Sequence, residues 1–316
     1  MKNNIQSDKI LILGAKGILG QELAEVFNNL KPVLWDKENL DITDEKSVCG
    51  RIFELKPDII INAAAYTAVD DCEINRDLAM KVNGEAVKYL MGTFLSLLPL
   101  PAPQVMRDGE RQKKVPVFIH YSTDYVFDGN KRGGYQEDDE PRNPVNIYGE
   151  SKFLGEKYIK RLISNFKFLN NGNFRWYIIR TSWLYGRGGR NFVDTISELL
   201  KKRDQIQVVN DQYGKPTYTY DLAIKTRELL EGDYVSGVYH ITNETANKEK
   251  GISWYDFAEE IFLINREKIK GNKEITPCVS REFPRPAKRP KWSALLNIKL
   301  PLMRNWREAL KDYLNG

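Results

Sequence analysis

The chain has 316 residues, of which 41% are hydrophobic and 29% are charged, as is typical of a globular protein with one large domain or two modest ones. Its 48 basic and 43 acidic residues leave a net charge of +5, and the two signs are interspersed along most of the chain. This balance excludes the concentrated basic charge of a typical nucleic-acid binder, so we expect no nucleic-acid partner.

Strands and helices are predicted to alternate along the first 185 residues. Residues 9–13 form a short β-like run, a glycine turn follows, and the next residues, QELAEVFNNL, carry apolar side chains at helical spacing. The same reasoning predicts strands at residues 32–36, 58–65, 115–123 and 176–183, and helices at residues 44–56, 75–97 and 148–166. The alternation predicts an α/β fold of the Rossmann type, a doubly wound parallel sheet with helices on both faces and ligands at the carboxyl ends of its strands.

The remainder of the chain is less regular, and we expect it to form a smaller α/β lobe. Proline and glycine are more frequent after about residue 185, residues 243–251 are polar, and residues 281–291 are basic and contain prolines. Residues 302–314 are amphipathic and are predicted to be a helix. We assign residues 1–185 and about 218–242 to the Rossmann domain, and about 186–217 and 243–316 to the second lobe.

The glycine turn GAKGILG, residues 14–20, is the first candidate site. Gly14, Gly17 and Gly20 are spaced three apart, and the missing side chains let backbone amides at the helix start approach a pyrophosphate. An ordinary strand-to-helix turn is the alternative. The position between the first predicted strand and an amphipathic helix favours a dinucleotide.

Two opposing signals leave the choice of cofactor open. Asp36, at the end of the second predicted strand, is placed to accept hydrogen bonds from ribose hydroxyls, which favours NADH. Lys16 and Lys37 would instead neutralise the extra phosphate of NADPH. We therefore expect either NADPH or NADH.

The segment YGESK, residues 148–152, is the second candidate site. Tyr148 and Lys152 share a helix face, and a nearby ammonium lowers a tyrosine pKa from about 10, so the pair can donate a proton to a developing alkoxide. Two solvated side chains are the alternative. Upstream, a predicted strand ends in Ser122, Thr123 and Asp124, where a hydroxyl can hydrogen-bond the same substrate oxygen.

Other kinds of site are not favoured by the sequence. Cys49, Cys72 and Cys278 lie far apart without CxxC spacing, and two histidines cannot form a His-rich metal site, so we expect reduced thiols. The amino-terminal residues lack the long apolar region of an export signal, and the apolar run near residues 94–105 is interrupted by prolines. We expect a cytoplasmic protein without a membrane segment.

Several sequence blocks, in order, resemble the extended short-chain dehydrogenase/reductases and, within them, the dTDP-4-dehydrorhamnose reductase family. The blocks span nearly the whole chain and are INAAAYTAVDDCE (61–73), HYSTDYVFDG (120–129), NPVNIYGESKFLGE (143–156), RTSWLYG (180–186), NF (191–192), VVNDQYGKPT (208–217) and RPAKRP (285–290). The resemblance implies NAD(P)H-dependent reduction of the C4 keto group of dTDP-4-dehydro-6-deoxy-L-mannose to dTDP-L-rhamnose, for surface polysaccharide biosynthesis.

The resemblance also implies roles for individual residues. Tyr148 would be the proton donor, Lys152 would bind the nicotinamide ribose and tune the tyrosine, and Thr123 would hydrogen-bond the keto oxygen. The implied cofactor contacts are Gly14, Lys16, Gly17, Ile18, Leu19, Gly20, Asp36, Asp41, Ile42, Ala63, Ala64, Ala65, Tyr66, Tyr148 and Lys152. The implied substrate contacts are Asp124, Tyr125, Val126, Trp183, Asn191 and Arg289, with Arg285 and Lys288 as alternatives to Arg289 at the diphosphate.

Metal binding and assembly are less determined. Some family members hold Mg²⁺ between subunits through acidic residues, and Glu22 matches one such position; a glutamate that stabilises a first helical turn is the alternative. The family implies a homodimer. Residues 99–114 are longer than the family's usual connection, and we expect a surface loop without a role, with a subunit contact as the alternative. A smaller extension near residues 168–175 follows the predicted catalytic helix.

Two other functions are compatible with the sequence. Another nucleotide-sugar reductase or epimerase would keep the fold and the catalytic residues, and would differ around Trp183. A silent NADP-binding subunit, resembling the regulatory subunit of methionine adenosyltransferase, would keep the glycine turn without needing Thr123, Tyr148 and Lys152. The presence of all three favours an enzyme.

Overall fold

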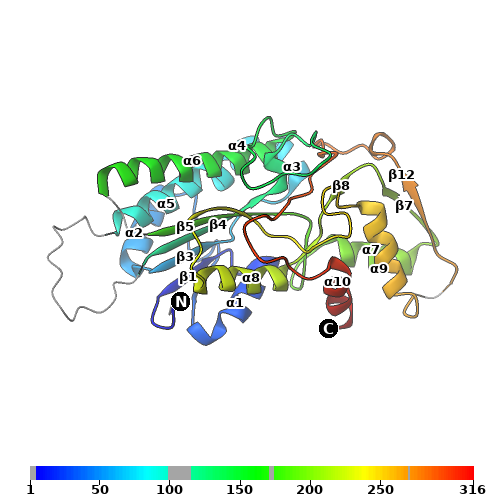
Figure 1. Ribbon diagram of the computed structural model, residues 1–316, viewed down its shortest axis with the longest axis horizontal. Coiled ribbons are helices and arrows are strands. Elements are labelled where there is room, and N and C mark those ends of the chain that lie inside the picture. Colours follow the sequence, from blue (N-terminus) through cyan, green and yellow to red (C-terminus); the bar gives the residue numbers. More distant parts are fainter. Residues whose placement is uncertain (1–4, 99–114, 171–173, 270) are drawn as a thin grey trace.

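A six-stranded parallel sheet forms the centre of the molecule (Figure 1). The computed structural model describes residues 5–98, 115–170, 174–269 and 271–316. In spatial order the strands are β10 (Gly237–His240), β5 (Arg175–Thr181), β4 (Val117–Thr123), β3 (Ile59–Asn62), β1 (Ile10–Leu13) and β2 (Val33–Trp35), and each neighbouring pair is parallel. The predicted doubly wound parallel sheet is confirmed.

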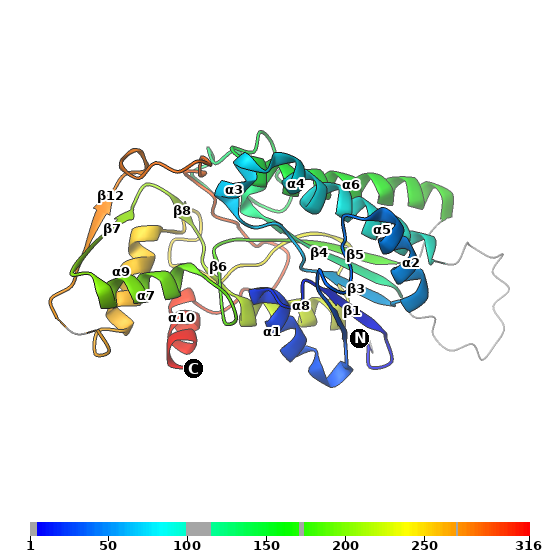
Figure 2. The same cartoon turned by 180° about the vertical axis from the view of Figure 1, so that it is seen from behind.

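Helices cover both faces of this sheet (Figures 1 and 2). Alternate strand residues point to opposite faces, so Ile10 and Ile12 pack in one core and Leu11 and Leu13 in the other. The first core includes residues of α1 (Ile18–Val26) and α8 (Thr219–Glu231), and the second includes residues of α2 (Glu45–Leu55), α5 (Ala86–Ser96) and α6 (Ile147–Asn170). The second core fixes α6, the helix that carries Tyr148 and Lys152, against the sheet.

The predicted helix at residues 75–97 is interrupted by a π-helical turn. The chain forms α3 (Val69–Ile74), α4 (Arg76–Met80), the π turn η2 (Lys81–Glu85) and then α5. Helix α6 packs closely on this turn, because a Cβ added at Gly155 would lie 2.5 Å from the carbonyl oxygen of Asn83. Irregular turns of this kind are frequent at functional sites.

The second lobe contains three helices and three short strand pairs within the described residues. The helices are α7 (Phe192–Lys202), α9 (Trp254–Ile264) and α10 (Trp306–Asn315). The pairs are β7 (Gln205–Val209) with β12 (Glu274–Cys278), β8 (Tyr213–Gly214) with β11 (Ile252–Ser253), and β6 (Leu184–Tyr185) with β9 (Thr217–Tyr218). Three short 3-10 turns lie in the described chain: η1 (Asn28–Leu30) after α1, η3 (Asp124–Val126) after β4, and η4 (Ser280–Glu282) after β12.

Some element boundaries differ from the prediction. Helix α10 begins at Trp306 and not at residue 302, because the side chain of Asn305 caps it by accepting a hydrogen bond from the backbone N–H of Arg307. Helix α6 continues to Asn170, beyond its predicted end at residue 166 and into the extension near residues 168–175. The proposed domain boundaries stay predictions, although α8 and β10 pack with the six-stranded sheet.

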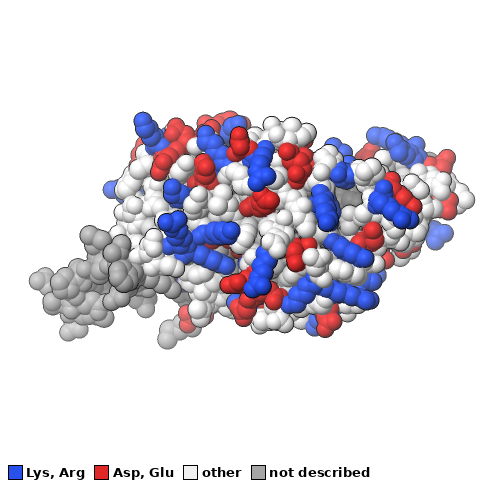
Figure 3. Space-filling view, turned by 90° about the horizontal axis from the view of Figure 1, so that it is seen from above, with Lys and Arg blue, Asp and Glu red and all other residues white. Residues whose placement is uncertain are grey.

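The predicted loop at residues 99–114 lies outside the described residues. In the part of the chain that the structure describes, no helix combines the length and the apolar character needed to cross a membrane. On the face shown in Figure 3, basic and acidic side chains are interspersed, as the sequence indicates.

Candidate active site

The glycine turn lies where the sheet reverses its strand order. Strands β2 and β3 lie on opposite sides of β1, which is the place where open parallel sheets bind ligands. Gly14 has a φ of +75°, and a Cβ there would lie 2.7 Å from the backbone nitrogen of Ala64. The turn therefore packs directly against the loop that follows β3, where Ala63, Ala64, Ala65 and Tyr66 lie partly exposed.

The start of α1 has the features of an anion-binding helix terminus. A Cβ at Gly20 would lie 2.0 Å from the carbonyl oxygen of Gly14, so only glycine lets the helix approach the turn. The N-cap residue Gly17 offers no side-chain cap, and the first turn, which includes Ile18 and Leu19, has no acidic residue. The first backbone N–H groups are therefore suited to a pyrophosphate, and the residues fit a dinucleotide.

The adenosine end of this site carries charges of both signs. The two carboxylate oxygens of Asp36 accept hydrogen bonds from the backbone N–H groups of Lys16 (2.9 Å) and Lys37 (2.7 Å). The ammonium of Lys16 pairs with Glu38 at 2.9 Å on the exposed surface. This arrangement provides carboxylates for ribose hydroxyls and ammonium groups for a phosphate, so it suits both cofactors.

Two predicted cofactor residues also have structural roles. Asp41 accepts hydrogen bonds from the hydroxyl (2.7 Å) and the backbone N–H (2.9 Å) of Thr43, which hold the pKa of Asp41 below its usual value. Ile42 is buried in the core with α2. Their side chains thus shape the loop that follows β2.

The structure brings Thr123 and Tyr148 together at the carboxyl end of β4. Thr123 is the last residue of β4, and Tyr148 lies in the first turn of α6. The rings of Tyr125 and Tyr148 meet edge to face at 5.8 Å. A Cβ added at Gly149 would lie 2.1 Å from the carbonyl oxygen of Tyr125, so the glycine of YGESK is what allows this approach.

The protonation of Tyr148 and Lys152 differs in part from the prediction. Burial raises the pKa of Tyr148, and the hydrogen bond with the Thr123 hydroxyl only partly opposes this effect. The pKa of Tyr148 is therefore raised and not lowered as expected, because the loss of solvation dominates. That Lys152 tunes this pKa stays a prediction. The ammonium of Lys152 is buried and donates a hydrogen bond to the carbonyl oxygen of Tyr121 at 2.6 Å. Burial lowers the pKa of Lys152 to about 8, against the opposing charge of Glu156.

The sequence interpretation missed a buried ion pair beside Lys152. Glu156 accepts hydrogen bonds from Arg180 Nε (2.9 Å) and Nη2 (2.7 Å), and neither side chain is exposed. It also accepts a hydrogen bond from Ser122 Oγ at 2.6 Å. The sequence does carry a signal, since Arg180 is a charged residue inside a predicted buried strand and Glu156 follows Lys152 by one helical turn.

Asn83, in the π turn, was also missed. Its amide oxygen accepts a hydrogen bond from the backbone N–H of Tyr66 (2.8 Å), and its amide nitrogen donates to the Tyr66 carbonyl (3.0 Å) and to Ser151 Oγ (3.0 Å). Asn83 therefore joins the loop after β3 to α6. No short motif indicates this role, because it depends on how two helices pack.

The predicted substrate residues after β4 have different surroundings. Asp124 is buried, burial raises its pKa to about 7, and its Oδ1 accepts a hydrogen bond from the Thr123 hydroxyl at 3.0 Å. Tyr125 is partly exposed beside Tyr148. Val126 is fully buried with Phe127, so a contact with a sugar would come from its backbone.

Two predicted substrate residues, Trp183 and Asn191, contact helices of the second lobe. Trp183 has a φ of +49°, an unusual value for a bulky residue, and its ring stacks on Trp254 of α9 at 3.5 Å. Asn191 caps α7, because its side-chain oxygen accepts a hydrogen bond from the backbone N–H of Asp194. Trp254 was not identified from the sequence, and its contact joins residues far apart in the chain.

The basic segment near residue 289 is attached to the Rossmann domain. Arg289 pairs with Asp70 of α3 at 2.6 Å, and Asn146 Nδ2 donates to the carbonyl oxygen of Lys288 at 2.7 Å. The side chains of Lys288 and Arg285 are exposed. Arg289 is thus already paired with a carboxylate, whereas its two basic neighbours face solvent.

The structure also places the candidate metal residue. Glu22 is the fifth residue of α1 and is buried, and burial raises the pKa of its carboxyl group. The interpretation of Glu22 as a first-turn residue is therefore wrong. Within the described ranges, no three His, Cys, Asp or Glu residues gather as metal ligands, and the three cysteines are free thiols.

Comparison with known families identifies the lineage of the chain. The family model described as RmlD substrate binding domain matches residues 8–93 and 104–316. The chain belongs to this family. The resemblance inferred from the sequence blocks is confirmed.

Several relatives match this chain over almost their whole length. The spore coat polysaccharide biosynthesis protein SpsK of Bacillus subtilis is 36% identical, over 97% of this chain and 96% of the relative. A dTDP-4-dehydrorhamnose reductase of Burkholderia thailandensis is also 36% identical, over 96% of each chain. The crystal structure of a dTDP-4-dehydrorhamnose reductase from Bacillus anthracis in complex with NADP has a TM-score of 0.81 and 34% identity, over 98% of this chain and 99% of that chain.

Proposed function

We propose that this protein is an NAD(P)H-dependent oxidoreductase that reduces the C4 keto group of dTDP-4-dehydro-6-deoxy-L-mannose to give dTDP-L-rhamnose. The observation that carries the proposal is the placement of Thr123 and Tyr148 together at the carboxyl end of β4, in a chain whose named relatives include full-length dTDP-4-dehydrorhamnose reductases. The relative from Bacillus subtilis supports a place in polysaccharide biosynthesis.

The residues divide the reaction between them. A bound nicotinamide supplies the hydride that is added to C4 of the sugar. Tyr148, whose raised pKa keeps the phenol protonated, donates its proton to the keto oxygen as that oxygen becomes an alkoxide. The Thr123 hydroxyl, which lies beside Tyr148, rotates to hydrogen-bond the same oxygen. The ammonium of Lys152 lies one helical turn away and binds the nicotinamide ribose.

Other residues are proposed to bind the cofactor and the sugar nucleotide. The open N-terminus of α1 holds the cofactor pyrophosphate, with Asp36 at the adenosine ribose. Trp183 provides an aromatic surface for the sugar nucleotide, and the basic residues near Arg289 meet its diphosphate. The homodimer, the Mg²⁺ site and the cytoplasmic location stay predictions.

The proposal is tested by following NADPH and NADH oxidation at 340 nm with freshly generated dTDP-4-dehydro-6-deoxy-L-mannose. We expect rapid oxidation by the native protein and a loss of about 10²–10⁴-fold in kcat for Tyr148→Phe, with cofactor binding retained in a fluorescence titration. NMR of the product distinguishes rhamnose from a talose product. Cofactor binding without oxidation of any nucleotide-linked keto sugar would contradict the proposal and favour a silent NADP-binding subunit.

A further inference from the structure

The buried carboxylate of Glu156 is bonded to β4 next to the strand residues that contact Lys152 and Tyr148. Ser122, which donates a hydrogen bond to Glu156 at 2.6 Å, stands in β4 between Tyr121 and Thr123. The Tyr121 carbonyl accepts the hydrogen bond of Lys152, and Thr123 lies beside Tyr148. The Glu156 carboxylate therefore contacts β4 at Ser122, the residue between Tyr121 and Thr123.

Arg180 keeps this carboxylate ionised. Burial alone would raise the pKa of Glu156, but the charge and hydrogen bonds of Arg180 and the hydroxyl of Ser122 hold it below its usual value. A buried carboxylate with this many donors is satisfied as an anion. Glu156 is thus a fixed negative charge one helical turn from Lys152.

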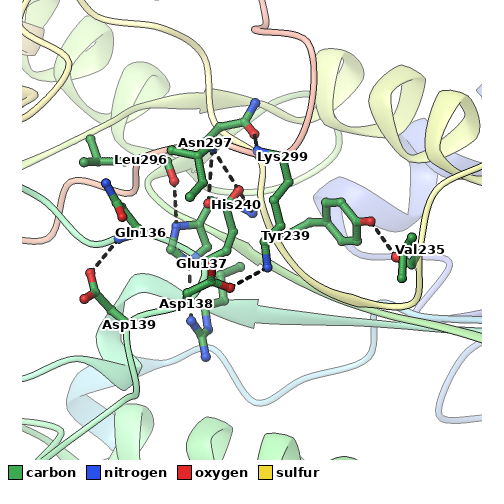
Figure 4. Close-up of polar contacts among 12 residues, drawn as sticks. Gln136, Glu137, Asp138, Asp139, Val235, Tyr239, His240, Leu296, Asn297 and Lys299 are labelled. Carbon is green, nitrogen blue, oxygen red and sulfur yellow. Dashed lines mark hydrogen bonds and ion pairs between the residues drawn. The ribbon is translucent and has the colours of Figure 1, made fainter.

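The far side of Arg180 contacts His240, which is in turn bonded to Leu296 in the carboxyl-terminal part of the chain. Figure 4 shows the contacts of His240 with Leu296 and Glu137. Arg180 Nη1 lies 3.4 Å from His240 Nε2, and His240 Nδ1 donates to the Leu296 carbonyl at 3.1 Å, which leaves Nε2 as the acceptor for Arg180. Burial holds the pKa of His240 well below its usual value, so this ring is neutral. The backbone N–H of His240 points to the carboxylate of Glu137 at 3.4 Å. Arg180 therefore cannot turn away from Glu156 without breaking a second contact.

Two titratable groups interact with Lys152, Glu156 on its own helix and His120 on β4. A third, Tyr148, lies one turn before Lys152 on the same helix. Burial, with the charge of Lys152, holds the pKa of His120 well below its usual value, so His120 is neutral, and Tyr148 is a neutral phenol. Of these three groups, Glu156 supplies the negative charge that opposes the desolvation of Lys152.

We propose that Glu156 is a positioning residue that acts through two neighbours: its carboxylate keeps the buried Lys152 ammonium charged, and its bond to Ser122 holds the strand end that carries Thr123. Arg180 serves as the counter-ion that makes this buried anion stable. The catalytic consequence rests on the proposed function, because a neutral Lys152 would lose its charge-assisted hydrogen bond to the nicotinamide ribose.

The direct test is an NMR titration of Lys152 in the protein without substrate, with ¹³C and ¹⁵N labels in lysine and Lys152→Met for assignment. In Glu156→Gln we expect the Lys152 pKa to fall by about 1–2 pH units, as the loss of an opposing unit charge on the next helical turn predicts at an effective dielectric constant near 20. The alkaline limb of kcat should move down by the same amount, so that the activity lost at pH 8 recovers as the pH is lowered. Glu156→Asp keeps the negative charge, so the fall of kcat at alkaline pH should occur at the same pH as in the native protein.

Two control variants separate charge from position. Glu244→Gln breaks another buried ion pair, with Lys215 at 3.5 Å, and should leave the titration of Lys152 unchanged. Ser122→Ala removes the bond to β4 but not the charge, and should lower kcat without moving the alkaline limb. If Glu156→Gln does not fold, the double variant Glu156→Gln/Arg180→Met removes both buried charges. The Lys152 pKa should then still fall, by a smaller amount than in Glu156→Gln, because the lost positive charge of Arg180 offsets part of the effect.

The outcomes are distinct. A lower melting temperature for Glu156→Gln with an unchanged Lys152 titration and an unchanged alkaline limb would overturn the inference and leave Glu156 a purely structural residue. An inactive native protein would instead contradict the proposed function, and the NMR titration would still decide the role of Glu156, because it needs no substrate.

Discussion

The edge of the sheet that holds Tyr148 and the lobe that packs against Trp183 are organised differently. At the sheet edge, backbone groups hold the site: the carbonyl of Tyr125 lies against Gly149, and the carbonyl of Tyr121 accepts the hydrogen bond of Lys152. In the second lobe, Trp183 is held by the ring of Trp254, a side chain from a distant part of the chain. Backbone contacts leave little room to adjust, whereas stacked rings can shift. Changes at the sheet edge should therefore act on kcat, and changes in the lobe on substrate KM.

The largest effect is expected for Gly149→Ala. A Cβ at this position would lie 2.1 Å from the backbone oxygen of Tyr125, so α6 must move away from β4 and carry Tyr148 with it. A displacement of about 1 Å at reacting groups can cost about 10²-fold, and we expect a loss of that size in kcat. Steady-state kinetics at saturating cofactor and substrate measures it.

Gly214→Ala is the matched variant in the second lobe. Its Cβ would lie 2.7 Å from the indole of Trp183, a side chain that can rotate. We expect the main effect in the KM of the sugar nucleotide, with kcat less affected than in Gly149→Ala. If Gly149→Ala retained the kcat of the native protein, the close approach of α6 to β4 would not matter for the chemistry.

Trp254→Ala should weaken substrate binding without a comparable loss of chemistry. The ring of Trp254 stacks on Trp183 at 3.5 Å and contacts Phe192 at 4.5 Å. An aromatic pair of this kind contributes about 0.5–1.5 kcal/mol beyond the area it buries, so we expect the KM of the sugar nucleotide to rise about 2- to 10-fold. The KM of NADPH should not change, because the glycine turn is untouched.

The conservative variant at this position sharpens the test. Trp254→Phe keeps an aromatic surface and should raise the KM by a smaller factor than Trp254→Ala. A fall in kcat with an unchanged KM in either variant would mean that the stack supports the reacting groups and not the substrate.

Local patterns made the sheet edge largely predictable. Alternating apolar runs placed β1, β3, β4 and β5, and helical spacing placed Tyr148 and Lys152 on one helix face. The pKa of Tyr148 was predicted in the wrong direction, because the degree of burial depends on tertiary packing that spacing does not reveal. The Glu156–Arg180 pair was missed for the same reason.

The second lobe was less predictable because its contacts join distant segments. The partner of Arg289 is 219 residues away, and no periodicity in the sequence connects Asp70 to it. Trp183 was found through the family resemblance alone, and Trp254 not at all. Side chains that meet only in the folded chain leave no local pattern, so this lobe was described as less regular without being resolved into its strand pairs.

Asp70→Asn should destabilise the protein in a pH-dependent way. The hydrogen bond from Arg289 outweighs partial burial and lowers the pKa of Asp70 in the folded state. A lowered carboxyl pKa stabilises the fold above the unfolded value of about 3.9, and this contribution is lost as the pH falls through the folded value. For this partly exposed pair we expect a cost of about 1 kcal/mol at pH 7, measured by urea denaturation.

The pH dependence identifies the cause. The difference in the free energy of unfolding between the native protein and Asp70→Asn should narrow as the pH is lowered below about 4, because the native carboxyl becomes neutral as well. Asp138→Asn removes a more exposed pair, with Lys299 at 2.8 Å, and should have little effect at any pH. A difference that stayed constant with pH would show that Asp70 acts through packing and not through its charge.

Gly50→Ala should have the smallest effect, a small gain in stability, whereas Gly149→Ala should lower kcat. Gly50 is an exposed residue inside α2, and a Cβ there would meet nothing within 4 Å. Alanine loses less backbone entropy on folding than glycine, so we expect about 0.5–1 kcal/mol of added stability in urea denaturation, with unchanged kcat and KM. A loss of stability would contradict this reasoning. The same change from glycine to alanine thus raises stability at Gly50, where the new methyl group meets open space, and lowers activity at Gly149, where it meets a backbone carbonyl.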